Sequence, residues 1–161
     1  MTNIFSPQEI LRIAVKVEEK GKKLYEILEK KSSDKKVTNL WKYLKEQEEI
    51  HRKTFQDMLD GIGDYVVAEV TPGEYGAYIK AIASGYIFTV ELMEKKINES
   101  FASDLEAVEF GLYIEKESIL TYSALREYIT LEKQPVLDKV IVEEKEHLIK
   151  LMLLRGEIKK R

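Results

Sequence analysis

Two short stretches decide the fold of this chain, EQEEIH at residues 46–51 and EEKEHL at residues 143–148. Each contains one of the two histidines in the sequence, and in each a glutamate precedes the histidine by three residues. Residues three apart lie on the same face of a helix, so each stretch presents a carboxylate and an imidazole side by side. The two pairs are Glu48 with His51 and Glu144 with His147.

Both pairs interrupt rows of apolar residues that have helical spacing. Leu44 and Phe55 continue the row of the first pair, and Val140 and Leu151 continue that of the second. The same periodicity, with Ser, Asp and Pro at the expected starts, predicts four long helices. The first two cover about residues 7–31 and 34–61, the third opens at Ser103 and carries inward residues to Leu125, and the fourth opens at Pro135 and carries them to Leu154. Short connections within each half predict two antiparallel helix hairpins.

The connection between the two hairpins, about 61–103, is much longer than bundle neighbours need. A cap pattern at Thr71–Glu74 and the apolar spacing after it predict a helical stretch to about Ser84, followed by a second helical piece at about 88–98. The predicted fold is therefore all-α: a four-helix bundle with a long helical crossover between its second and third helices. We expect a single domain over residues 1–161.

An internal repeat relates the two halves. VEEKGKKLYEIL at 17–28 aligns without gaps on IEKESILTYSAL at 114–125, and the two Glu-x-x-His pairs follow at nearly equal distances. In each half a glutamate on the apolar row, Glu18 or Glu115, comes seven residues before a tyrosine. These tyrosines, Tyr25 and Tyr122, are either hydrogen-bond partners of the two carboxylates or ordinary core residues.

Six ionisable side chains thus fall in the middle of buried rows. Four carboxylates in a core would repel one another and cost several kcal/mol each unless they were neutralised. One Glu from each of two helices and one Glu-x-x-His from each of the other two is the ligand set of ferritin-like di-iron and di-manganese bundles. The six predicted ligands of a dinuclear metal site are Glu18, Glu48, His51, Glu115, Glu144 and His147.

Composition limits the kind of metal and of partner. The sequence has no cysteine, which excludes disulfides, thiolate zinc sites and iron–sulfur clusters, and we expect no haem. Oxygen-rich ligation with two imidazoles favours two iron ions, with manganese or a mixed pair possible. A net charge of −3 with interleaved signs argues against nucleic acid. No apolar run is long enough to cross a membrane and no leader is evident, so a cytoplasmic location is expected.

At these residues the chain resembles the rubrerythrin family of the ferritin-like superfamily. The matching stretches are VEEKGKKLY, EQEEIH, IEKESILTY and EEKEHL, together with EYGAYIKAIASGYIFTVELMEKKI in the crossover. The resemblance implies a non-haem di-iron oxidoreductase that reduces hydrogen peroxide or oxygen and responds to oxidative stress. It also implies the six ligands named above and a homodimer.

Two departures from the family pattern bear on activity. Rubrerythrins usually carry a rubredoxin-like domain with four cysteines, whereas this sequence ends at Arg161 and has none. Electrons would then come from a separate donor such as a rubredoxin-type protein. Classical members also have an extra glutamate three residues after the third-helix ligand, and here that position is Ser118, with Gly21 as its repeat mate.

Two other functions therefore stay open at the level of sequence. The chain could bind iron or manganese for storage or delivery, with at most ferroxidase activity. It could also be a purely structural or interaction bundle in which the repeat is vestigial.

Overall fold

The computed structural model describes residues 7–61 and 74–161, and this part of the chain is helical with short turns. Four helices form the bundle and a fifth forms the crossover. Their bounds are α1 Pro7–Lys31, α2 Lys35–Asp60, α4 Glu74–Asn98, α5 Asp104–Arg126 and α6 Gln134–Lys159. The predicted all-α, ferritin-like four-helix architecture is confirmed.

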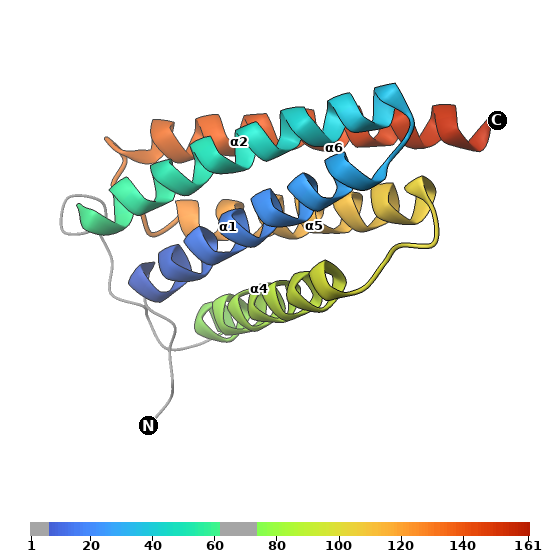
Figure 1. The fold of residues 1–161 in the computed structure, drawn as a ribbon. Coiled ribbons are helices and arrows are strands. Elements are labelled where there is room, and N and C mark those ends of the chain that lie inside the picture. The colour runs from blue at the N-terminus through green and yellow to red at the C-terminus, as the bar shows by residue number, and fades with distance from the viewer. Residues whose placement is uncertain (1–6, 62–73) are drawn as a thin grey trace.

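The bundle consists of two antiparallel hairpins packed against each other (Figure 1). Helix α1 packs along α2 and α5 packs along α6, while contacts of α1 with α5 and of α2 with α6 close the bundle. A turn of three residues joins α1 to α2, and Asp34 caps α2 by accepting hydrogen bonds from the backbone N–H groups of Lys36 and Val37 at 2.9 and 3.1 Å. The sharp turn fixes the antiparallel direction of the first hairpin.

The crossover is a single helix rather than the two shorter pieces predicted from sequence. Helix α4 runs without a break through Ser84 and Gly85, and the Thr89 hydroxyl donates a hydrogen bond of 3.1 Å to the Gly85 carbonyl. A glycine inside a helix costs about 1 kcal/mol relative to alanine, which packing of the helix can offset. Helix α4 packs on α1 and α5, on the side away from α2 and α6 (Figure 1).

The predicted helix starts agree with the structure where it describes them. Ser103 accepts a hydrogen bond of 3.2 Å from the Glu106 backbone N–H, and the Glu106 carboxylate accepts one from the Ala102 backbone N–H at 2.6 Å. Pro135 lies in the first turn of α6. The caps predicted at Ser6 and Thr71 lie outside the described residues.

The core is a continuous apolar cluster along the bundle axis. Trp41 is fully buried and its indole ring stacks on the Tyr25 ring at a centroid separation of 5.5 Å. Over the described ranges, none of the helices has the length and apolarity needed to pass through a lipid bilayer. The same axis holds the buried polar residues considered next.

Candidate metal centre

The structure brings all six residues predicted from the repeat to the centre of the bundle. Each of the four bundle helices supplies its share: Glu18 from α1, Glu48 and His51 from α2, Glu115 from α5, and Glu144 and His147 from α6. All six are at most 3 % exposed. Charged groups with so little access to water need partners that neutralise them.

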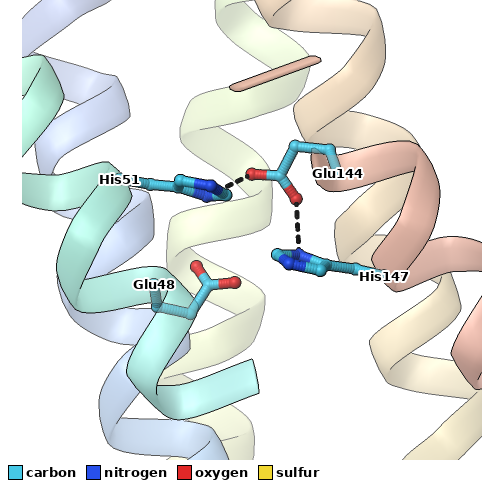
Figure 2. Close-up of side chains that lie close together, drawn as sticks. All are labelled: Glu48, His51, Glu144 and His147. Atoms are coloured by element: carbon cyan, nitrogen blue, oxygen red, sulfur yellow. Dashed lines mark hydrogen bonds and ion pairs between the residues drawn. The ribbon is translucent and has the colours of Figure 1, made fainter. Parts of the chain in front are cut away.

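Glu144 lies between the two histidines (Figure 2). Its Oε1 is 3.0 Å from His51 Nδ1 and its Oε2 is 3.3 Å from His147 Nδ1. Ligand atoms of these three residues and of Glu48 all lie within 4.8 Å of one another. Both imidazoles therefore turn Nδ1 towards the same small volume.

The other two glutamates complete the two ends of the cluster. Glu18 Oε2 lies 3.8 Å from His51 Nδ1, and Glu115 Oε2 lies 3.5 Å from His147 Nδ1. The two imidazole rings are stacked with centroids 5.5 Å apart. The cluster therefore has two halves, one built on Glu18 and His51 and the other on Glu115 and His147, with Glu48 and Glu144 between them.

Each tyrosine of the repeat bonds to the glutamate of the opposite half. The Tyr25 hydroxyl on α1 donates a hydrogen bond of 2.7 Å to Glu115 Oε1 on α5. The Tyr122 hydroxyl on α5 donates a short hydrogen bond to Glu18 Oε1 on α1. One oxygen of each glutamate is thus held by a phenol, which leaves Oε2 of each facing the cluster.

Gly21 provides space for the Glu48 carboxylate. A Cβ atom at position 21 would lie 2.8 Å from Glu48 Oε2 and 3.3 Å from its carboxyl carbon, closer than ordinary contacts. Gly21 is one turn after Glu18 on α1, so the two helices approach closely where the carboxylate reaches the cluster. The glycine is therefore part of the site's shape rather than of a turn.

Burial and mutual repulsion raise the pKa of three of the four carboxyls. The pKa of Glu48 lies well above its usual range because of burial and the neighbouring charge of Glu18. Burial followed by the charge of Glu144 raises the pKa of Glu115 to about 8, and burial also raises that of Glu18. Glu144 is the exception: burial would raise its pKa, but contacts with Glu115 and both histidines lower it.

The same negative charges also raise the pKa of both histidines, which favours their charged form. Burial alone would lower the pKa of His51, but the Glu144 contact and the charge of Glu18 raise it to about 9. The pKa of His147 rises to about 10 against its burial because of Glu115 and Glu144. Without a metal, neutralisation of the cluster therefore depends on protons shared among its own side chains.

The donor set fits two divalent cations. Within the described ranges, Glu18 Oε2 and Glu115 Oε2 are buried and have no hydrogen-bond partner, while Glu144 Oε1 and His51 Nδ1 have only each other, at 3.0 Å. No lysine or arginine is among the buried residues of this part of the chain, so four carboxylates are set against only two imidazoles. Cations bound by oxygen and imidazole would satisfy these atoms and the excess negative charge.

Sequence reasoning missed Glu143. It lies off the apolar row of its helix, and such a position, like that of Glu146, predicts a solvated surface residue. In the structure Glu143 Oε2 lies 3.0 Å from His51 Nε2, and its side chain is only 25 % exposed. The contact depends on how α2 and α6 face each other, which the spacing within α6 alone does not reveal.

A second missed residue is Tyr86 of the crossover helix. Its buried hydroxyl donates a short hydrogen bond to the Tyr122 hydroxyl and lies 3.4 Å from Ser118 Oγ. Burial and the charge of Glu18 raise the pKa of both phenols well above 10, so both stay protonated and can donate. A donor chain therefore runs from Tyr86 through Tyr122 to Glu18.

Substituting Tyr86 with phenylalanine is expected to destabilise the protein by about 1 kcal/mol, because the Tyr122 oxygen loses its buried donor. The free energy of unfolding of the metal-free protein in urea measures this change. Phe88→Tyr on the same helix is the control, because this ring is 54 % exposed and a hydroxyl added there should change stability little. Equal stabilities of the two variants would show that the Tyr86 hydrogen bond contributes nothing.

An all-helical bundle with a crossover helix and a buried Glu/His cluster defines the class of ferritin-like di-metal carboxylate proteins. Comparison with known proteins supports this class and narrows it. A sequence model of the family Rubrerythrin matches residues 9–155, nearly the whole chain. The chain therefore belongs to the rubrerythrin family.

One solved structure shows the same fold at low sequence identity. It is a protein of Thermotoga maritima described as a candidate ferritin-like diiron-carboxylate protein. The two chains share 24 % identity with a TM-score of 0.70, and the match covers 98 % of this chain and 99 % of that one. No curated protein matches the sequence.

Proposed function

We propose that this chain is a di-iron oxidoreductase that reduces hydrogen peroxide or oxygen at the buried Glu/His cluster. The observation that carries the proposal is the set of buried carboxylate and imidazole atoms that converge inside the bundle with no lysine or arginine among them. Membership of the rubrerythrin family and the ferritin-like fold agree with it.

We infer a role for each proposed ligand from its place in the cluster. Glu18 and His51 would hold one iron ion, and Glu115 and His147 the other, because these atoms lie together at the two ends. Glu48 and Glu144 lie between the histidines and would serve as ligands shared by the two ions. Tyr25 and Tyr122 hold the outer oxygens of the terminal glutamates, and so fix which oxygen faces the metals.

When bound in the ferrous state, two iron ions would supply the two electrons that, with two protons, reduce one hydrogen peroxide molecule to two water molecules. The six side chains are nearly inaccessible to solvent, so the site suits a very small substrate. With no cysteine in the sequence, the electrons that restore the ferrous state are proposed to come from a separate donor protein.

Stopped-flow spectroscopy of the reduced, iron-loaded protein tests this function. Mixing with hydrogen peroxide, and separately with oxygen, should produce the absorption of oxidised carboxylate-bound iron. The rate should exceed that of free ferrous ion by orders of magnitude. Repeated cycles with a chemical reductant should then consume peroxide in excess over protein. A reduced protein whose spectrum does not change with either oxidant would refute the proposal.

Storage or delivery of iron or manganese is the second candidate function, and Ser118 favours it. Ser118 is a buried hydroxyl in contact with Tyr86 at the position of the extra carboxylate of classical rubrerythrins. The proposed site would then have six ligands, with no carboxylate at position 118 to exchange with a histidine. A single oxidation without repeated turnover, followed by transfer of the metal to a chelator, would support this function over the first.

Metal loading is expected to stabilise the protein, and the gain should increase with pH. At a free Mn(II) concentration 100 times the dissociation constant, the gain is about 2.7 kcal/mol, or roughly 5–10 °C in Tm for a domain of this size. Protons compete with the metal, because the pKa values of His51 and His147 are raised to about 9 and 10 in the metal-free protein. Lowering the pH from 8 to 6 should therefore shrink the Tm gain.

Thermal unfolding with and without Mn(II) at pH 6, 7 and 8 measures this effect. Mg(II) is the control ion, because it binds poorly to imidazole. An identical gain with both ions, or a gain that does not depend on pH, would contradict binding at the histidines.

A further inference from the structure

The two histidines differ in what their outer nitrogens contact. His51 Nε2 lies 3.0 Å from Glu143 Oε2 on α6, and the other oxygen of Glu143 lies 3.8 Å from Lys139 Nζ. His147 Nε2 is buried and has no hydrogen-bond partner anywhere in residues 7–61 and 74–161. Instead the Tyr43 ring meets the His147 ring edge-on, with centroids 5.8 Å apart.

The internal repeat explains the difference. Glu48 and His51 align with Glu144 and His147, so the residue before each glutamate occupies the same place in its half. That residue is Glu143 in the second half and Gln47 in the first. Position 47 therefore has an amide where the equivalent position 143 has a carboxylate. Of the two histidines, only His51 has an anionic partner at Nε2.

The two tyrosines of the repeat also differ in the contacts that support them. Tyr122, which bonds to Glu18, receives a hydrogen bond from Tyr86. Tyr25, which bonds to Glu115, stacks on Trp41 instead. The half built on Glu18 and His51 is thus supported by polar contacts on both of its ligands, whereas the other half is supported by aromatic packing.

We propose that the two metal positions are unequal, and that the position held by Glu18 and His51 binds its ion more tightly because Glu143 positions His51. This inference rests on the metal centre proposed above. A carboxylate on the outer nitrogen keeps the N–H there, leaves Nδ1 free to ligate and makes the imidazole a stronger donor. It also holds the ring in the orientation that aims Nδ1 at the cluster.

Titration of the metal-free protein with Mn(II) tests the inequality. Isothermal titration calorimetry should show two steps whose dissociation constants differ by about 10- to 100-fold, the usual effect of such an outer partner. Electron paramagnetic resonance after one equivalent should show mainly isolated Mn(II). The coupled dinuclear signal should grow only with the second equivalent. Two identical steps would overturn the inference.

Substituting Glu143 with glutamine should weaken the tighter step by about 10- to 100-fold and leave the weaker step nearly unchanged. Glu146→Gln is the matched control, because Glu146 is an exposed glutamate on the same helix and its loss should alter neither step. A general disturbance of the fold would weaken both steps, so a selective loss identifies a positioning role. If the two variants behave alike, Glu143 has no such role.

The reciprocal substitution Gln47→Glu gives a second test, in which metal affinity is expected to increase and not to decrease. A carboxylate at this position should give His147 Nε2 the partner that His51 already has. The weaker step should then tighten towards the stronger one, and an unchanged weaker step would argue against the mechanism. Failure of the wild-type protein to bind any Mn(II) or Fe(II) would instead refute the proposed metal centre, so the two failures are distinguishable.

Discussion

Glu144→Gln should both destabilise the metal-free protein and abolish metal binding. Glu144 contacts both histidines, and removal of one partner from a buried charge cluster costs about 3 kcal/mol. For a domain of this size that corresponds to a Tm roughly 6–12 °C lower. The Tm gain on adding Mn(II) should disappear as well, because an amide cannot bridge two cations. Thermal unfolding of the metal-free and Mn(II)-treated proteins measures both effects.

Glu48→Gln is the informative companion to this variant. Burial and the charge of Glu18 raise the pKa of Glu48, which favours its neutral carboxyl in the metal-free protein, and a glutamine has nearly the same shape and charge as that neutral form. Its metal-free stability should stay within about 1 kcal/mol of the wild type, while metal binding is lost. Equal destabilisation by the two variants would contradict the contrast between Glu48 and Glu144. A full Mn(II) response of Glu48→Gln would exclude Glu48 as a ligand.

Gly21→Ala is expected to lower metal affinity without lowering the stability of the metal-free protein. The new Cβ would lie 2.8 Å from Glu48 Oε2, so the carboxylate must move away from its place in the cluster. It is the flexible end of a side chain, and alanine favours the helix by about 1 kcal/mol, so the metal-free protein should be at least as stable as the wild type. Metal affinity should nevertheless fall by roughly tenfold or more.

Gly156→Ala provides the matched control, because a Cβ at that position of α6 meets nothing within 4 Å. This variant should gain up to about 1 kcal/mol from helix propensity and bind Mn(II) as the wild type does. Calorimetric titration and urea unfolding of the two variants give the comparison. Wild-type affinity in Gly21→Ala would mean that the close approach of α1 to Glu48 has no part in the site.

Much of the fold could be predicted because helix periodicity and capping are local properties. The Ser32–Asp34 break and the cap at Ser103 mark helix ends through their own side chains and backbone. The break predicted near Gly85 was wrong because continuity of the helix there depends on packing and not on local sequence. Packing of α4 on α1 and α5 holds that glycine in a helix, and a local pattern carries no information about packing.

The six clustered residues could also be predicted, since a charged group in an apolar row is visible in one helix at a time. The contacts around them could not. Glu143 reaches His51 across the α2–α6 interface, and Tyr86 reaches Tyr122 from the crossover. Both contacts depend on the rotation and depth at which helices dock. The direction of the tyrosine bonds, each to the opposite half, is equally a product of docking.

That crossing of the two tyrosine bonds has a consequence for how the site forms. The bonds join residues 90 and 104 positions apart, and neither hairpin contains both members of either pair. A hairpin folding by itself would contain one glutamate, one Glu-x-x-His pair and one tyrosine. The hydroxyl of that tyrosine would lack the carboxylate to which it bonds in the complete bundle. The terminal carboxylates take their final orientation only when the halves meet, so the complete set of buried Glu and His side chains exists only in the assembled bundle and in neither half alone.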